Sequence, residues 1–178
     1  MKKIVWTFGL IAGGIMSVMM LLTLPFHNQI GFSAAGYIVG YTSMVLAFLM
    51  VYFGVRTYRD NAAGGRVTFG RAFLVGLWIT LIGSLCYVVT WELIYFFVTP
   101  DFMDKYAAFE LAKARAAGAS AQELAAKATQ LAQFARMYRN PLFNAAMTLI
   151  EPLPVGLVFT LVSAGIVSRK QPVAGSAA

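Results

Sequence analysis

Four long stretches of almost uninterrupted apolar residues alternate with short polar segments along the chain. They cover residues 4–26, 34–55, 71–98 and 141–167. Each reaches the roughly 20 residues that an α-helix needs to cross the ~30 Å hydrocarbon core of a bilayer. Because that core offers no water to backbone groups, a spanning segment must satisfy its own hydrogen bonds as a helix. The pattern predicts an all-α polytopic membrane protein with four transmembrane helices in one domain.

The first apolar stretch could instead be a cleaved secretory signal, since it follows Met1-Lys2-Lys3. Signal sequences carry a shorter apolar region of about 7–15 residues, followed by a cleavage site of small residues. This stretch is longer, and no such site precedes His27. We therefore expect a retained transmembrane helix.

The composition changes the picture little. Of the 178 residues, 60% are hydrophobic and 12% are charged, against about 25% charged in an average soluble domain. The net charge of +7 could suggest a nucleic-acid partner. The basic residues lie beside the apolar stretches, however, and this placement favours anionic lipid headgroups. We expect the lipid bilayer, and no nucleic acid, as the partner.

The basic residues also predict the orientation. Eight of the 14 Lys and Arg residues lie in one set of segments, at both termini and between the second and third spans, where Asp60 is the one acid. The segment between the first two spans has no Lys or Arg, and the segment between the last two spans is mixed in charge. The positive-inside rule places that set, and with it both termini, in the cytoplasm. We expect the loop arginines to meet lipid headgroups. The loop arginines are Arg56, Arg59, Arg66 and Arg71.

Residues 99–139 form the one segment that is typical of a water-exposed structure. Thr99, Pro100 and Asp101 suggest a helix start with Thr99 as the N-cap. Gly118 interrupts the helical pattern, and Ser120 with Glu123 fits a capping box for a second helix. We predict an extracytoplasmic helical hairpin that turns at residues 117–119. The tail, residues 171–178, is expected to be disordered.

Two acidic residues, Glu92 and Glu151, lie within predicted spans. A charge at the bilayer centre costs at least about 2.5–3.5 kcal/mol, so such residues usually face a bundle interior or a cavity. Counted along their helices, both could lie at similar depth near the outer leaflet, where His27 ends the first span. We expect a polar pocket there, with Tyr41, Thr42 and Ser43 on its wall. Alternatively, the Glu92 side chain extends to the outer membrane–water interface, and Glu151 caps or hydrogen-bonds the helix within the kink made by Pro152 and Pro154.

No pattern for catalysis, a cofactor or a metal accompanies these acids. The chain has one cysteine, Cys86, and one histidine, so it lacks disulfide pairs and metal-ligand spacings. No nucleophile motif surrounds a serine. We predict no catalytic residues, no metal and no cofactor.

Several short motifs carry a family resemblance over most of residues 4–169. They are Gly40-Tyr-Thr-Ser-Met44, Tyr58-Arg-Asp60, Gly65-Arg-Val-Thr-Phe-Gly70, Trp91-Glu92, Pro100-Asp-Phe-Met-Asp-Lys-Tyr106 and Glu151-Pro-Leu-Pro-Val-Gly156. In these the chain resembles the bacterial membrane proteins of domain-of-unknown-function family 4199. The resemblance implies a bacterial inner-membrane protein and assigns no activity.

Three functions stay open on these grounds. The first is an accessory membrane protein that acts through helix contacts or through a periplasmic partner of the hairpin. The second is a proton- or cation-coupled carrier that uses Glu92 and Glu151, and the third is a lipid-modifying enzyme. Gly9-x-x-x-Gly13 and Gly36-x-x-x-Gly40 allow close helix approach, within the bundle or in a homo-oligomer. The first function is favoured because no residue pattern demands chemistry.

Overall fold

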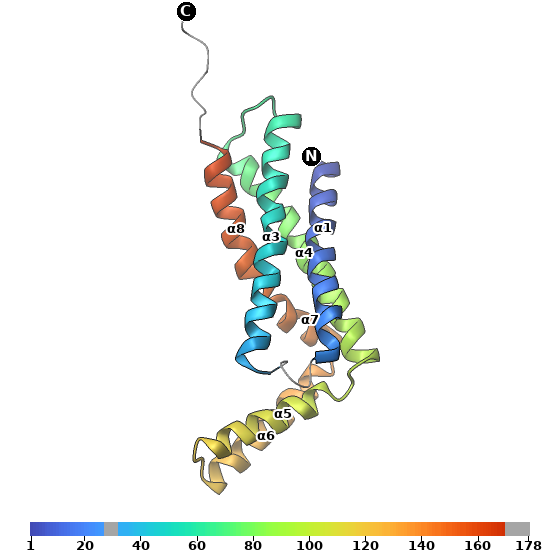
Figure 1. The fold of residues 1–178 in the computed structure, drawn as a ribbon, viewed down its shortest axis with the longest axis vertical. Helices are drawn as coiled ribbons and strands as arrows, with labels where there is room; N and C mark the ends of the chain where they lie inside the picture. The colour runs from blue at the N-terminus through green and yellow to red at the C-terminus, as the bar shows by residue number, and fades with distance from the viewer. Residues whose placement is uncertain (27–31, 170–178) are drawn as a thin grey trace, which may run out of the picture.

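The computed structural model describes residues 1–26 and 32–169, and in these every regular element is a helix (Figure 1). The elements are α1 (Lys2–Thr23), η1 (Leu24–Phe26), α3 (Ala34–Ala62), α4 (Phe69–Phe97), α5 (Phe102–Ala116), α6 (Ala121–Tyr138), α7 (Pro141–Leu149) and α8 (Pro152–Val167). The predicted all-α fold is confirmed. His27 and the tail at 171–178 lie outside the described residues.

Four segments are long and apolar enough to cross a membrane: Lys2–Phe26, Ala34–Ala62, Phe69–Phe97 and Pro141–Val167. The chain is therefore a multi-pass membrane protein. Large apolar side chains such as Ile38 and Leu85 cover the outside of the bundle, as expected where hydrocarbon replaces water.

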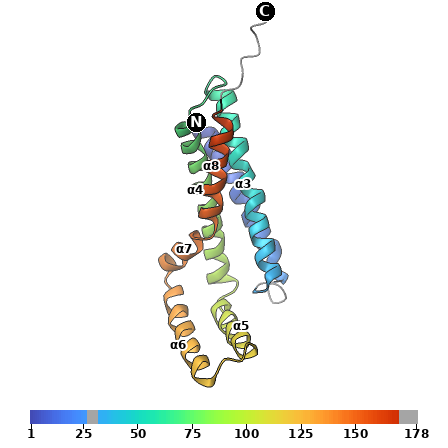
Figure 2. The same cartoon turned by 90° about the vertical axis from the view of Figure 1, so that its left-hand side faces the viewer.

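The four spanning segments run side by side, and the α5–α6 hairpin extends beyond one end of them (Figures 1 and 2). The N-terminus, the α3–α4 turn and the end of α8 lie at the opposite end. We call these the hairpin end and the arginine end, since the α3–α4 turn contains Arg66. The basic segments of the sequence therefore lie together at one end of the bundle, and the hairpin lies at the other.

Small residues let the helices approach α4 closely. A side chain at Gly9 would overlap Ile82, and one at Gly13 would overlap Cys86, because α1 lies directly against α4 there. On the other side of α4, Gly156 of α8 lies against Thr80. The Gly9-x-x-x-Gly13 motif therefore serves packing within the bundle, whereas Gly40 has open space around it.

The fourth span is divided into two helices, α7 and α8, at Pro152. Proline lacks a backbone N–H and its ring clashes with the carbonyl four residues earlier. The N–H groups of the two residues before it donate to carbonyls three residues earlier, not four. Ile150 donates to the Met147 carbonyl at 3.2 Å, and Glu151 donates to the Thr148 carbonyl at 3.3 Å. As a result α7 leaves the axis of α8 (Figure 2), and Glu151 lies at the bend.

The hairpin contains the predicted turn and capping box. Gly118 has a φ of +86°, a backbone conformation that glycine adopts without strain. Glu123 N–H donates to Ser120 Oγ at 3.3 Å, and Ser120 N–H donates to Glu123 Oε2 at 2.7 Å. Across the hairpin, Lys127 Nζ lies 2.7 Å from Glu110 Oε2. The turn at 117–119 and the start of the second helix are confirmed.

The predicted start of the first hairpin helix is wrong. Asp101, not Thr99, precedes the first helical residue, Phe102. The Thr99 hydroxyl donates to the Ile94 carbonyl at 3.4 Å. Thr99 thus closes the end of α4 instead of capping α5.

Candidate functional site

A cavity of about 410 Å³ opens at the hairpin end, where α4, α7 and the hairpin meet. Eight of its thirteen lining residues are aromatic, and Glu151 is the one charged residue among these described residues. The lining residues are Phe32, Tyr37, Tyr87, Trp91, Phe102, Met103, Tyr106, Phe134, Tyr138, Met147, Thr148, Ile150 and Glu151. Five elements contribute to this wall, so the cavity exists only in the folded chain.

Glu151 is held at the cavity by α4. The bend before Pro152 turns it toward Tyr87, whose hydroxyl donates to Glu151 Oε2 at 2.8 Å. Within the described part of the chain, no donor reaches Glu151 Oε1, and no cation pairs with this carboxylate. The site therefore presents a carboxylate that is oriented through one oxygen and open at the other.

A buried amide, Asn144, holds the aromatic wall in place. Its side chain is 0% exposed. Asn144 Oδ1 accepts from Trp91 Nε1 and from Thr148 Oγ1, each at 3.1 Å, and its Nδ2 donates to the Tyr138 carbonyl at 3.4 Å. Trp91 Nε1 also donates to Tyr138 Oη at 3.1 Å. Because buried polar groups are costly when unpaired, this satisfied network fixes α4, α6 and α7 relative to one another.

Asn144 is not among the residues that the sequence predicts for a site. A signal was present, since Asn144 and Thr148 are four residues apart on an otherwise apolar helix and must share one face. Nothing in the sequence pairs that face with Trp91.

Aromatic contacts join the hairpin to the bundle. The Phe32 ring, just before α3, lies 5.4 Å from the ring of Phe102 and 5.6 Å from that of Tyr106. The Phe102 ring also meets Trp91 edge to face at 4.8 Å. Such pairs add about 0.5–1.5 kcal/mol each beyond area burial, so the base of the hairpin is anchored to the cavity wall.

A second, smaller cavity of about 130 Å³ lies between α1 and α3. Its lining is mainly methionine and glycine, with Met16, Met20 and Met44 among them. Tyr87 also lines the aromatic cavity, so the two cavities share Tyr87 in their walls.

The predicted pocket residues are distributed over different surfaces. Glu151 lines the aromatic cavity and Ser43 lines the smaller one, where its hydroxyl donates to the Val39 carbonyl at 2.7 Å. Tyr41 and Thr42 are exposed on the outside of α3.

Glu92 is not among the described residues that line either cavity. It follows Tyr87 by five residues, which turns it about 140° around the α4 axis. Its Oε1 is buried, and no hydrogen-bond partner lies among the described residues. The structure thus gives Glu151 a tyrosine partner and a cavity, and directs Glu92 to another face of α4.

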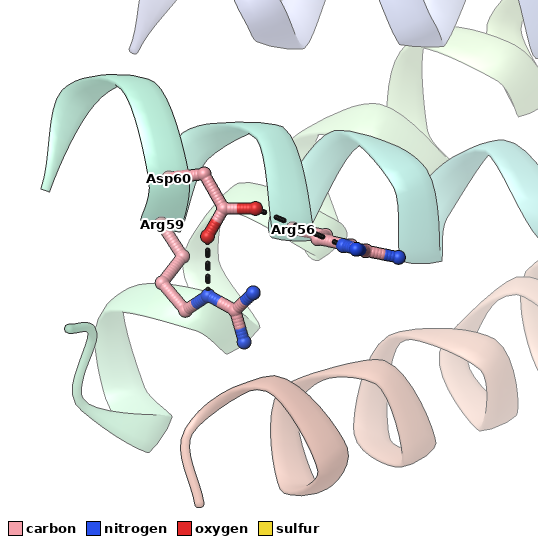
Figure 3. Close-up of polar contacts among 3 residues, drawn as sticks. All are labelled: Arg56, Arg59 and Asp60. Carbon is pink, nitrogen blue, oxygen red and sulfur yellow. Dashed lines mark hydrogen bonds and ion pairs between the residues drawn. The ribbon is translucent and has the colours of Figure 1, made fainter. Parts of the chain in front are cut away.

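At the arginine end, one carboxylate holds two of the loop arginines (Figure 3). Asp60 Oδ1 lies 2.7 Å from Arg59 Nε, and Asp60 Oδ2 lies 3.7 Å from Arg56 Nε. The Arg59 side chain is 13% exposed, against 54% for that of Arg56. Arg66 and Arg71 are exposed and stay expected contacts for lipid headgroups.

The model of one protein family, described as Protein of unknown function (DUF4199), matches residues 7–169. No curated protein and no solved structure matches the chain.

Proposed function

The chain belongs to the DUF4199 family, and we propose that it is a non-enzymatic accessory membrane protein that binds an amphiphile in the aromatic cavity. One observation carries the proposal: an aromatic cavity of about 410 Å³ with a few oriented polar groups on its wall. Small-molecule sites are typically concave, mostly apolar and about 300–1,000 Å³ in volume, with few polar groups that fix orientation. This cavity has that size and character.

We further propose that the protein lies in a bacterial inner membrane with both termini in the cytoplasm. The basic residues at the arginine end support this orientation through the positive-inside rule. The cavity then opens near the outer interface of the membrane, where tryptophan and tyrosine are the favoured residues. An amphiphile would reach it from the outer leaflet or from the periplasm.

We also propose that the protein contacts other protein molecules through its hairpin and its helices. None of the described residues of α6 is buried, so the hairpin offers surface to a periplasmic partner. Gly36 and Gly40 of α3 line the smaller cavity, so a homo-oligomer stays an expectation that rests on the small-residue spacing of this helix alone.

The two other functions have less support. A carrier needs a polar path through the bundle, but the arginine-end half is packed around Phe48, Val51 and Ile79, all 0% exposed. Thr80 in this half is engaged, since it bonds Thr160 at 3.0 Å. A lipid-modifying enzyme that uses acids would need Glu151 to act with a second group, and among the described residues its partner is a tyrosine.

The test is to identify what occupies the cavity in native membranes. A benzophenone photo-crosslinker replaces Ile150, which lines the cavity and is 60% exposed. The matched control carries it in place of Ile166, an isoleucine of α8 that is 49% exposed and lines neither described cavity. After irradiation of membranes, the protein is purified and its adducts are identified by mass spectrometry.

We expect a restricted set of amphiphiles on the Ile150 variant and the bulk phospholipids on the Ile166 variant. If both positions yield the same bulk mixture, the cavity is an ordinary lipid-facing surface and the proposal fails.

A further inference from the structure

We infer that the aromatic cavity selects organic cations, and that its ligand is an amphiphile with a compact ammonium head and an apolar chain. The inference rests on the proposed function and adds the chemical class of the ligand. It depends on three features: a carboxylate with no cationic partner among the described residues, an aromatic wall, and a second, mainly apolar cavity that shares Tyr87 with the first.

The first feature is the sign of the charge. Glu151 is the single charged group among the described lining residues, and no Lys or Arg of the described chain forms an ion pair with it. The Glu151 side chain is exposed and its Oε1 is open, so a cation can reach it, and opposite charges attract more strongly beside apolar walls than in bulk water. A cation would therefore be attracted, whereas an anion would be repelled.

The second feature selects an organic cation over a metal ion. A calcium ion takes about 6–8 oxygen ligands, yet the described residues contain no group of three His, Cys, Asp or Glu side chains that could hold a metal. Aromatic rings attract a weakly hydrated ammonium group through the cation–π interaction. Trp91, the most effective ring type for this contact, is held in the wall by Asn144.

The third feature concerns the rest of the ligand. Tyr87 holds the carboxylate and also lines the methionine-rich cavity between α1 and α3. A cation bound at Glu151 would thus lie near Tyr87, which also lines this second, mainly apolar cavity. An alkyl chain that extends into this second cavity would bury further apolar surface and so bind more tightly.

The inference is tested with three soluble probes of similar shape and different charge. They are hexyltrimethylammonium, the neutral hexyldimethylphosphine oxide, and hexanesulfonate. The protein, in maltoside micelles, carries Trp6→Phe and Trp78→Phe, so that Trp91 is the one remaining tryptophan of three. Its emission reports binding directly, since Trp91 lines the cavity.

We expect the cation to bind at least about tenfold more tightly than the neutral probe, a difference of about 1.4 kcal/mol, and the anion to bind most weakly. Glu151→Gln keeps an acceptor for Tyr87 but removes the charge, so the preference should fall to about threefold or less. Asp60→Asn, which removes an acid at the arginine end, is the control and should leave the preference unchanged.

Equal binding of the neutral probe and the cation by the unmodified cavity would overturn the inference, whatever happens in the variants. Amphiphile binding itself would then stand, because the crosslinking result does not depend on charge. Unchanged cation preference in Glu151→Gln would also overturn it. If no probe binds and crosslinking recovers only bulk lipid, both proposals fail together.

Discussion

Replacement of Asn144 by leucine tests the network that forms the cavity wall. The substitution keeps the branching and the number of heavy atoms of the side chain and removes every polar atom. Three hydrogen bonds disappear, those with Trp91 Nε1, Thr148 Oγ1 and the Tyr138 carbonyl. Any rearrangement that gives these groups new hydrogen-bond partners makes the loss of stability smaller.

The size of the stability loss depends on which of these three partner groups keep a hydrogen bond. Trp91 Nε1 keeps its bond to Tyr138 Oη at 3.1 Å, and the Thr148 hydroxyl can turn to the carbonyl of residue 144 one helical turn earlier. The Tyr138 carbonyl loses its side-chain donor. At about 1 kcal/mol for each net hydrogen bond, we expect the free energy of unfolding to fall by about 2–3 kcal/mol.

The assay is equilibrium unfolding in mixed micelles of maltoside and dodecyl sulfate, followed by circular dichroism. Asn61→Leu is the matched control because Asn61 is exposed near the end of α3, and such changes stay within about 0.5 kcal/mol. If both variants unfold at the detergent fraction of the wild type, Asn144 does not hold the three helices together and the description of the wall is refuted.

Two further predictions concern packing and charge. Gly13→Ala should lower the stability by about 1–3 kcal/mol, because the new methyl group overlaps Cys86. Gly14→Ala, with open space around it, should not, and a loss of stability in both variants would contradict the close approach of α1 to α4. In the hairpin, the hydrogen bond from Lys127 lowers the pKa of Glu110 below its ordinary value of 4.5. The pair therefore stabilises the fold above the unfolded-state pKa, and this contribution is lost as the pH falls through the lower folded-state pKa. Lys127→Met should raise the Glu110 pKa, measured by carbon NMR, and an unchanged value would argue against the pair.

The spans could be predicted from the sequence because each is a property of a single continuous segment. The division of the fourth span is also local, since Pro152 alone removes a helical hydrogen bond and displaces a carbonyl. The capping box at Ser120 is also a local feature, because both of its hydrogen bonds join residues three positions apart.

The composition of the site could not be predicted, because it depends on how the helices are rotated about their axes. Glu92 and Trp91 are neighbours in the sequence, yet one position turns a helix by about 100°. Trp91 consequently lines the aromatic cavity, and Glu92 does not. An apolar span surrounded by lipid has no polar face to reveal its rotation, and the partner of Glu151, Tyr87, is 64 residues away.

The most direct test of the account is the placement of the two ends of the bundle on opposite sides of the membrane. In a Cys86→Ser background, single cysteines replace Arg66 in the α3–α4 turn and Gln122 in α6, and intact cells are treated with a maleimide that does not cross membranes. We expect the cysteine at position 122 to be labelled at once and that at position 66 only after permeabilisation. Equal labelling of both in intact cells would contradict the orientation from which the location of the cavity follows.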